Sequence, residues 1–298
     1  MTEINDTQGV KQEETPKSNK KGNMLVRIIT AIVSIAIFVP VCIFSNTIVF
    51  NIFISLLSVV GCFEIAKCLG LQKNLALTIP VYIVAMGLPI LRHFQAGNRT
   101  FYAFAMISLF AILLYTLAYV MLRKNKDKLT NILPFFALIT YVIGCFSSIL
   151  AIRRSPNGAS VYLLVFLGAW ICDTFAYFTG VLIGKHKLIP EISPKKTIEG
   201  SIGGIIFTII GFIVYGLIMN NFFEAQLSYV YLAILGLVLS VVSQMGDLIA
   251  SAIKRQYSIK DFGNIFPGHG GVLDRFDSVM LSAPVLLVIN TIIIYFNL

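Results

Sequence analysis

The sequence predicts an all-α polytopic membrane protein with about nine transmembrane helices, an N-terminus inside the cell and a C-terminus outside. The prediction rests on composition, on the length of the apolar runs and on the distribution of basic residues. Of the 298 residues, 57% are hydrophobic and only 12% are charged. With a mean hydropathy of +0.85, this composition excludes a water-soluble enzyme, a disordered chain and a fibrous protein.

The apolar runs are long enough to cross a bilayer, whose hydrocarbon core requires about 20 helical residues. Several runs contain proline, which membrane helices tolerate. The sequence shows no alternating pattern of short strands, so a β-barrel is not expected. The predicted spans are 26–45, 47–67, 75–92, 100–122, 131–152, 159–183, 201–220, 228–250 and 277–297.

The basic residues set the predicted orientation. If the N-terminus is cytoplasmic, only Arg92, Arg99, Arg153 and Arg154 of the 23 Lys and Arg residues lie outside. The positive-inside rule therefore favours this orientation and an odd number of spans. The same rule accounts for the net charge of +9 without a nucleic-acid partner.

The chain divides into regions of different composition. Residues 1–24 are polar and of mixed charge, so we expect a disordered tail. Residues 25–298 should form a single transmembrane domain, with scaffold spans in 25–155 and the chemistry in 156–298. Beyond the tail, every acidic residue except Glu64 and Asp127 lies after residue 172.

Cysteine and histidine do not indicate a zinc or disulfide framework. The five cysteines lie in or beside apolar runs, no CxxC occurs, and the three histidines are far apart in the sequence. We expect the cysteines to be small apolar fillers.

Asp173 lies in the middle of the sixth apolar run. A carboxylate at membrane depth is costly unless it is paired or hydrated, so it is a functional candidate. Tyr177 lies one turn away on the same helix face. Small residues recur every fourth position from Gly168 to Gly184 and would let another helix approach closely. The alternative for Asp173 is a structural polar contact between helices.

Asp247 ends the eighth run and belongs to a polar stripe with Ser243, Ser251 and Lys254 on an otherwise apolar helix. Such a stripe faces a water-filled cavity or a partner helix and not lipid. Arg255 adds a second cation at the end of the stripe.

The first long loop is a basic turn in which Pro194 precedes Lys195, Lys196 and Thr197. Its glycine spacing excludes a Walker phosphate loop. Thr197 could cap the following helix, whose free N–H groups attract anions. The alternative for the two lysines is positive-inside charge or contact with lipid phosphate.

The second long loop, residues 251–277, is the most informative segment. It combines cations, carboxylates, an imidazole and paired glycines, namely Ser251, Lys254, Arg255, Lys260, Asp261, His269, Gly270, Gly271, Asp274, Arg275 and Asp277. Cations suit phosphate oxygens, carboxylates suit Mg²⁺, and glycines let the backbone approach a ligand. This combination favours phosphoryl or nucleotidyl transfer. His269 could be a general base, a phosphate donor or a brace for the glycine turn, and we favour the donor.

These motifs resemble those of the phosphatidate cytidylyltransferases, also called CDP-diacylglycerol synthases. The resemblance is sharp over about residues 168–278 and includes the motifs around Asp173, Ser193-Pro194-Lys195-Lys196-Thr197 and Gly246-Asp247. The polar tail departs from many relatives, which begin almost at the first span.

The resemblance implies that CTP and phosphatidate react to form CDP-diacylglycerol and pyrophosphate in a Mg²⁺-dependent homodimer, and it leaves open whether one or two cations bind. Asp247 and Asp274 would hold the metal, supported by Asp277 and Asp173. Cations would meet the substrate phosphates, namely Lys195, Lys196, Lys254, Arg255 and Arg275. The site would face the cytoplasm at the cell membrane, with the polar stripe entering the bilayer where the lipid stays.

Two alternatives remain. A related CTP-dependent transferase or kinase could act on another membrane lipid, since such proteins share parts of this loop. A transporter would also carry intramembrane carboxylates and broken helices, but it should have two halves of similar organisation.

Overall fold

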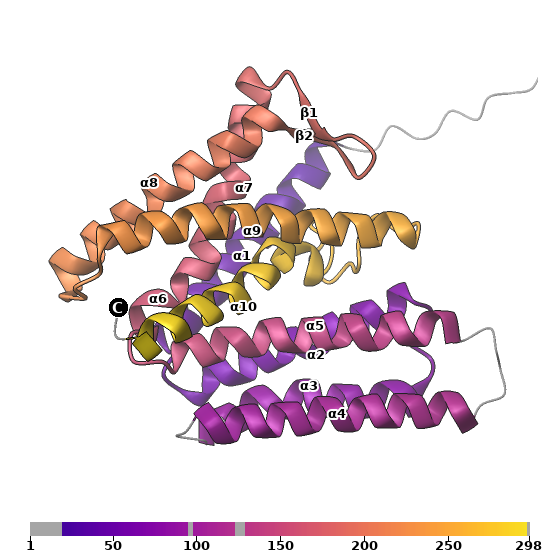
Figure 1. Ribbon diagram of the computed structural model, residues 1–298. Coiled ribbons are helices and arrows are strands. Elements are labelled where there is room, and N and C mark those ends of the chain that lie inside the picture. The colour runs from indigo at the N-terminus through magenta and orange to yellow at the C-terminus, as the bar shows by residue number, and fades with distance from the viewer. Residues whose placement is uncertain (1–19, 95–97, 123–128, 297–298) are drawn as a thin grey trace, which may run out of the picture.

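The computed structural model describes residues 20–94, 98–122 and 129–296 (Figure 1). Helices dominate these residues. The first half contains α1 (Lys20–Ile43), α2 (Ile48–Cys68), α3 (Leu75–Phe94), α4 (Asn98–Leu122) and α5 (Leu129–Arg153). The second half contains α6 (Gly158–Val161), α7 (Leu163–Ile183), β1 (Lys187–Ile189), β2 (Ser193–Thr197), α8 (Ile198–Phe223), α9 (Tyr229–Gln256) and α10 (Leu273–Phe296).

Nine segments within the described ranges are long and apolar enough to cross a membrane, which confirms the predicted number. The sixth of them runs from Gly158 to Ile183 and includes both α6 and α7. Residues 1–19 of the predicted tail lie outside the described residues, and α1 begins within that predicted tail, at Lys20.

The helix ends differ from the predicted ones around the second long loop. Helix α9 continues to Gln256, and α10 begins at Leu273. Lys254 and Asp274 therefore lie on helices and not in a loop. The prediction ended the eighth span at residue 250, before Lys254, and began the ninth at Asp277, whereas helical backbone hydrogen bonding extends through these charged residues.

The first long loop is a β-hairpin, which the all-α prediction did not include. Strands β1 and β2 are antiparallel, with Lys187 opposite Thr197 and Ile189 opposite Ser193. Pro190 lies in the connecting turn, where its fixed φ is favourable. Because side chains alternate along a strand, Lys195 is exposed while Lys196 is partly buried on the side facing the helices.

The helices form two groups (Figure 1). Helices α2 to α5 lie side by side in the lower part of the view, and α7 to α9 with the hairpin occupy the upper part. Helix α10 packs against both α5 and α9 and so joins the groups. The ring of Phe276 on α10 lies edge-on to Phe146 of α5 and to Phe166 of α7, with centroids 5.9 and 6.4 Å apart.

The predicted strip of small residues packs α7 against α8. A Cβ added at Gly200 would lie 2.6 Å from the carbonyl oxygen of Ala176, and one at Gly204 would lie 3.0 Å from Cys172. Only glycine allows this separation. The close packing holds the hairpin at the connection between α7 and α8, where Lys196 reaches Asp247 of α9.

Candidate active site

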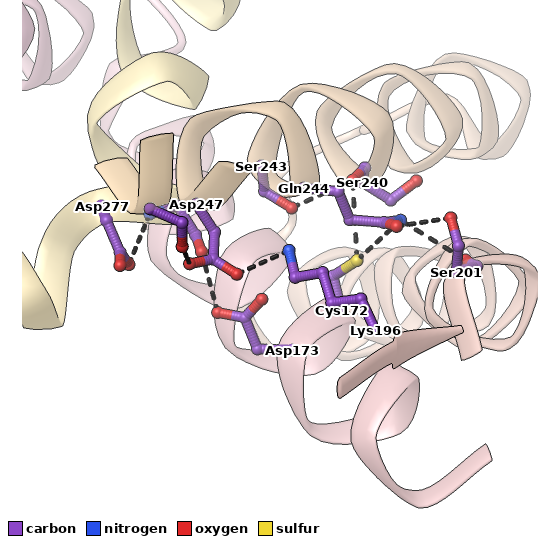
Figure 2. Close-up of polar contacts among 11 residues, drawn as sticks. Cys172, Asp173, Lys196, Ser201, Ser240, Ser243, Gln244, Asp247 and Asp277 are labelled. Atoms are coloured by element: carbon purple, nitrogen blue, oxygen red, sulfur yellow. Dashed lines mark hydrogen bonds and ion pairs between the residues drawn. The ribbon is translucent and has the colours of Figure 1, made fainter. Parts of the chain in front are cut away.

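Three carboxylates from different helices form the centre of the candidate site: Asp173 of α7, Asp247 of α9 and Asp277 of α10 (Figure 2). Ser278 links two of them, because its hydroxyl donates to Asp173 Oδ2 at 2.9 Å and its amide donates to Asp277 Oδ1 at 2.9 Å. Among the described residues, neither Asp173 nor Asp277 forms an ion pair with Lys or Arg. The centre is therefore acidic and suited to a cation.

The hairpin delivers a cation to this centre. Lys196 Nζ lies 2.5 Å from Asp247 Oδ2, and Ser251 donates to the other oxygen of Asp247 at 3.5 Å. The next residue, Thr197, caps α8 by accepting the amide N–H of Gly200 at 3.1 Å, which confirms the predicted cap. The cap makes Thr197 both the last residue of β2 and the start of α8, which holds Lys196 beside Asp247.

Asp274 is turned toward the second long loop. Its Oδ1 accepts a hydrogen bond from Lys254 Nζ at 3.0 Å, while its Oδ2 accepts the amides of Phe262 at 2.8 Å and Gly271 at 2.9 Å. The side chain is buried, and Gly270 beside it has a φ of +92°, a conformation that favours glycine. Asp274 thus holds both ends of the loop to α9.

The first half also contributes to the site, which the sequence reasoning missed. Glu64 of α2 accepts the amides of Val272 and Leu273, both at 2.9 Å. Arg27 and Thr30 of α1 donate to the carbonyls of Gly268 and Pro267 at 2.9 and 3.1 Å. A signal for Glu64 was available, because it is the one acidic residue within the first five predicted spans.

Two cavities adjoin the carboxylates and share Asp173 in their walls. The hairpin-side cavity, of about 460 Å³, is lined by Tyr177, Lys187, Lys195, Lys196 and Thr197 and also by Asp247. The α1-side cavity, of about 520 Å³, is lined by apolar residues such as Ile35, Phe38 and Trp170 and by the polar residues His269, Asp274, Arg275 and Asp277. One cavity is basic, and the other is largely apolar with one polar wall.

His269 lies in a tight turn closed by hydrogen bonds between Phe266 and Gly270. Its Nδ1 is buried and has no hydrogen-bonding partner among the residues that the structure describes. Burial, with the charges of Arg275 and Arg27 acting in the same direction, holds the pKa of His269 below its usual value. The imidazole is therefore neutral at pH 7, with one ring N–H available to donate.

Most of the predicted site residues adjoin one of the two cavities or the loop between them. The residues Tyr177, Lys195, Lys196 and Thr197 line the hairpin-side cavity. In the loop, Gly270 lies against Asp274, and Gly271 lies against Glu64. Arg255 is more distant: it is exposed, and its Nε lies 3.5 Å from the carbonyl of Ile192 in the hairpin.

The donor set suits a hard divalent cation. No three acidic, His or Cys side chains converge tightly enough for a protein-only cage in the part of the chain that the structure describes. Mg²⁺ does not require such a cage, because it is usually held by one or two carboxylates together with water and substrate phosphates. Asp173 and Asp277 form no ion pair with Lys or Arg among the described residues. Together with Asp247 they could supply the one or two carboxylates that Mg²⁺ needs.

A membrane-spanning bundle with acids and lysines around two adjoining cavities defines a membrane-embedded enzyme of phosphate chemistry. The chain belongs to the cytidylyltransferase family, whose model matches residues 25–293. It is 36% identical over 263 residues to the phosphatidate cytidylyltransferases of Staphylococcus saprophyticus and Staphylococcus haemolyticus, and 35% identical to that of Staphylococcus aureus. Each match covers 88% of this chain and 97% of the relative.

Proposed function

We propose that this protein transfers the cytidylyl group of CTP to phosphatidate, giving CDP-diacylglycerol and pyrophosphate. The observation that carries the proposal is the shared wall of the two cavities: Asp173 borders a basic cavity and a largely apolar one. A water-soluble triphosphate and a membrane lipid could meet there. The relatives, which are named phosphatidate cytidylyltransferases, support this pair of substrates.

The hairpin-side cavity is the proposed CTP site. Lys187, Lys195 and Lys196 supply positive charge for the triphosphate, and the exposed ring of Tyr177 offers an apolar face to the nucleoside. In this assignment Lys196 exchanges Asp247 for a phosphate oxygen when CTP binds. Asp247 then becomes available to a cation that arrives with the nucleotide.

The α1-side cavity is the proposed phosphatidate site. Its apolar residues on α1 and α7 suit acyl chains, and Arg275 and His269 line the same cavity near the acids. A charge-assisted contact from Arg275 and a neutral N–H donor from His269 would orient the phosphate. Because a phosphomonoester is already ionised near pH 7, the reaction does not demand a general base.

The proposed step is an in-line displacement. A phosphate oxygen of phosphatidate attacks the α-phosphorus of CTP, forming a new P–O bond while the bond to the bridging oxygen of the β-phosphate breaks. Pyrophosphate leaves with the electron pair. Positioning of the two substrates and neutralisation of charge by Lys196 and Arg275 would supply most of the acceleration.

Mg²⁺ is the proposed cofactor, held by Asp247 with Asp277 and Asp173 and by substrate phosphates. When bound, it would neutralise charge on the transferred phosphoryl group and on pyrophosphate. Asp274, the fourth predicted metal residue, already accepts three hydrogen bonds. We therefore assign it to shaping the loop and orienting Lys254, a role that differs from the one implied by the resemblance.

The proposed site opens toward the cytoplasm, where CTP is found. Support comes from the basic residues, which concentrate on that side in the predicted orientation. A homodimer in the cell membrane is proposed from the family resemblance, and the mass of the purified protein in detergent would test it.

The deciding experiment incubates purified protein with labelled CTP, phosphatidate and Mg²⁺. We expect a labelled lipid product and release of pyrophosphate. Parallel reactions with dolichyl phosphate and dolichol test the related transferases and kinases. A product formed only with those lipids would overturn phosphatidate as substrate, and uptake of a solute without any nucleotide turnover would favour a transporter.

A further inference from the structure

Glu64 is a buried carboxylate that the proposed reaction does not use. It lies near the end of α2, and only 1% of its surface is exposed. In the described part of the chain it forms no ion pair with a cation. A buried charge of this kind is costly unless hydrogen bonds compensate for it.

The compensation comes from the start of α10, more than 200 residues further along the chain. Glu64 Oε1 accepts the amide of Val272, and Oε2 accepts the amide of Leu273, both at 2.9 Å. The first amides of a helix have no partner inside that helix, and its N-terminus carries partial positive charge. Glu64 therefore caps α10 from a different helix.

The neighbouring amide completes a row of three. Gly271 donates to Asp274 Oδ2 at 2.9 Å, so the amides of three consecutive residues all end on two carboxylates. These two acids determine where α10 begins. The first turns of α10 carry Asp274, Arg275 and Asp277, three of the residues that line the α1-side cavity.

Two glycines of the loop leave the room that Glu64 needs. A Cβ at Gly263 or at Gly271 would lie 2.2 Å from Glu64 Oε1. Neither glycine has a positive φ, so backbone conformation alone does not require glycine at these positions. Glycine is required because the Glu64 carboxylate approaches both positions closely.

We propose that Glu64 is a positioning residue of the active site: it fixes the start of α10 and thereby places Asp274 to hold the loop and aims Arg275 and Asp277 at the substrates. This proposal rests on the proposed cytidylyl transfer, because that reaction defines the substrates toward which these side chains point. It assigns a functional group to the half of the molecule that sequence reasoning treated as scaffold.

The test compares Glu64→Gln with Ser55→Ala. Gln keeps the size of the side chain but places an NH₂ donor against one backbone N–H. Ser55 is a matched control because it is buried in the same helix and donates to the carbonyl of Met86 at 3.0 Å, away from the loop. For folded, monodisperse Glu64→Gln we expect kcat to fall about 100-fold, as a small misplacement at a reacting centre can cause, with KM for CTP little changed. Ser55→Ala should keep the wild-type kcat.

Hydrogen exchange supplies a readout that does not depend on turnover. The amides of residues 271–273 should exchange faster in Glu64→Gln than in wild type and be unaffected in Ser55→Ala. Wild-type kcat with unchanged exchange in Glu64→Gln would overturn the proposal while leaving cytidylyl transfer intact. A wild-type protein that makes no CDP-lipid would count against the proposed function, and the exchange rates would still decide whether Glu64 holds the helix start.

A second pair of variants keeps the test decisive if Glu64→Gln does not fold. Gly263→Ala displaces the carboxylate without removing it, so it should lower kcat in the wild-type background. Glu64→Asp keeps the carboxylate but withdraws it by one methylene, which leaves space for the added methyl group, and there the same substitution should cause little further loss. Equal losses in both backgrounds would contradict the contact.

Discussion

Helices α2 to α5 and helices α7 to α10 are similarly apolar, yet they differ in the side chains that they place inside the bundle. The first group buries mainly apolar residues such as Phe50, Phe135 and Ile139, with Glu64 and Arg92 as buried charged residues. The second group places Asp173, Asp247 and Asp277 around the two cavities. Hydropathy therefore identifies spans in both groups, whereas carboxylates that line a cavity distinguish the second group from the first.

The largest expected effect comes from Asp274→Asn in the second group. The amide would place a donor against Lys254 or against the loop amides, so the loop would lose part of its anchor to α9. We expect turnover to fall at least about 1,000-fold in protein that still folds. Thr78→Ala in α3, which removes a buried hydroxyl bonded to the carbonyl of Asn74, should leave turnover unchanged. Full activity of Asp274→Asn would remove Asp274 from the site.

Lys196→Ala tests whether the hairpin belongs to the functional group of elements. It removes the cation that pairs with Asp247 and that is proposed to meet CTP. We expect kcat/KM for CTP to fall about 100-fold, mainly through KM. Lys73→Ala is the matched control, because Lys73 is an exposed lysine of the first half. An equal effect of both substitutions on steady-state kinetics would mean that general surface charge, and not the hairpin site, attracts the nucleotide.

Gly200→Ala tests packing in the second group by thermal unfolding in detergent. Its Cβ would lie 2.6 Å from the Ala176 carbonyl, so we expect a loss of about 1–3 kcal/mol. At Gly144 in α5, an added Cβ would meet no atom within 4 Å apart from the backbone of its own helix and its chain neighbours. Gly144→Ala should therefore stabilise its helix by up to about 1 kcal/mol. Similar results at both glycines would show that α7 and α8 do not approach as closely as described.

The smallest expected effect concerns pH. The pKa of His269 is lower in the folded protein than its ordinary value, mainly because of burial. Just below that ordinary value the unfolded chain binds more protons than the folded one, so stability falls as the pH falls through this window. His269→Gln should reduce the difference in Tm between pH 7.5 and pH 5.5. An unchanged difference would mean that His269 is not held neutral.

Much of this molecule could be predicted from the sequence, because span length and helix periodicity are local properties. The nine spans, the small-residue packing of α7 and the Thr197 cap belong to this class. The hairpin was missed because the strands are short and lie in a loop rich in lysine and proline. The extension of α9 through Lys254 was missed because hydropathy falls at a charge while the backbone hydrogen bonds continue.

The roles of the acids were harder to predict because they depend on contacts between distant parts of the chain. The sequence places Asp274 in a charged segment but does not show that loop amides and Lys254 already occupy its oxygens. Glu64 stands alone in an apolar span, and only the fold brings it to the start of α10. For Asp173, the sequence indicated a costly buried charge, and the structure supplies Ser278 as its hydrogen-bonding partner.

The contact between Arg27 and Gly268 spans 241 positions of the chain. During synthesis, α1 leaves the ribosome long before the loop that it will contact. Likewise, α2 is made long before the start of α10, which Glu64 contacts. A nascent chain that has inserted its first eight spans therefore holds the hairpin cavity but lacks the opposite wall. Assembly of the site is in this way deferred until the last helix enters the bilayer.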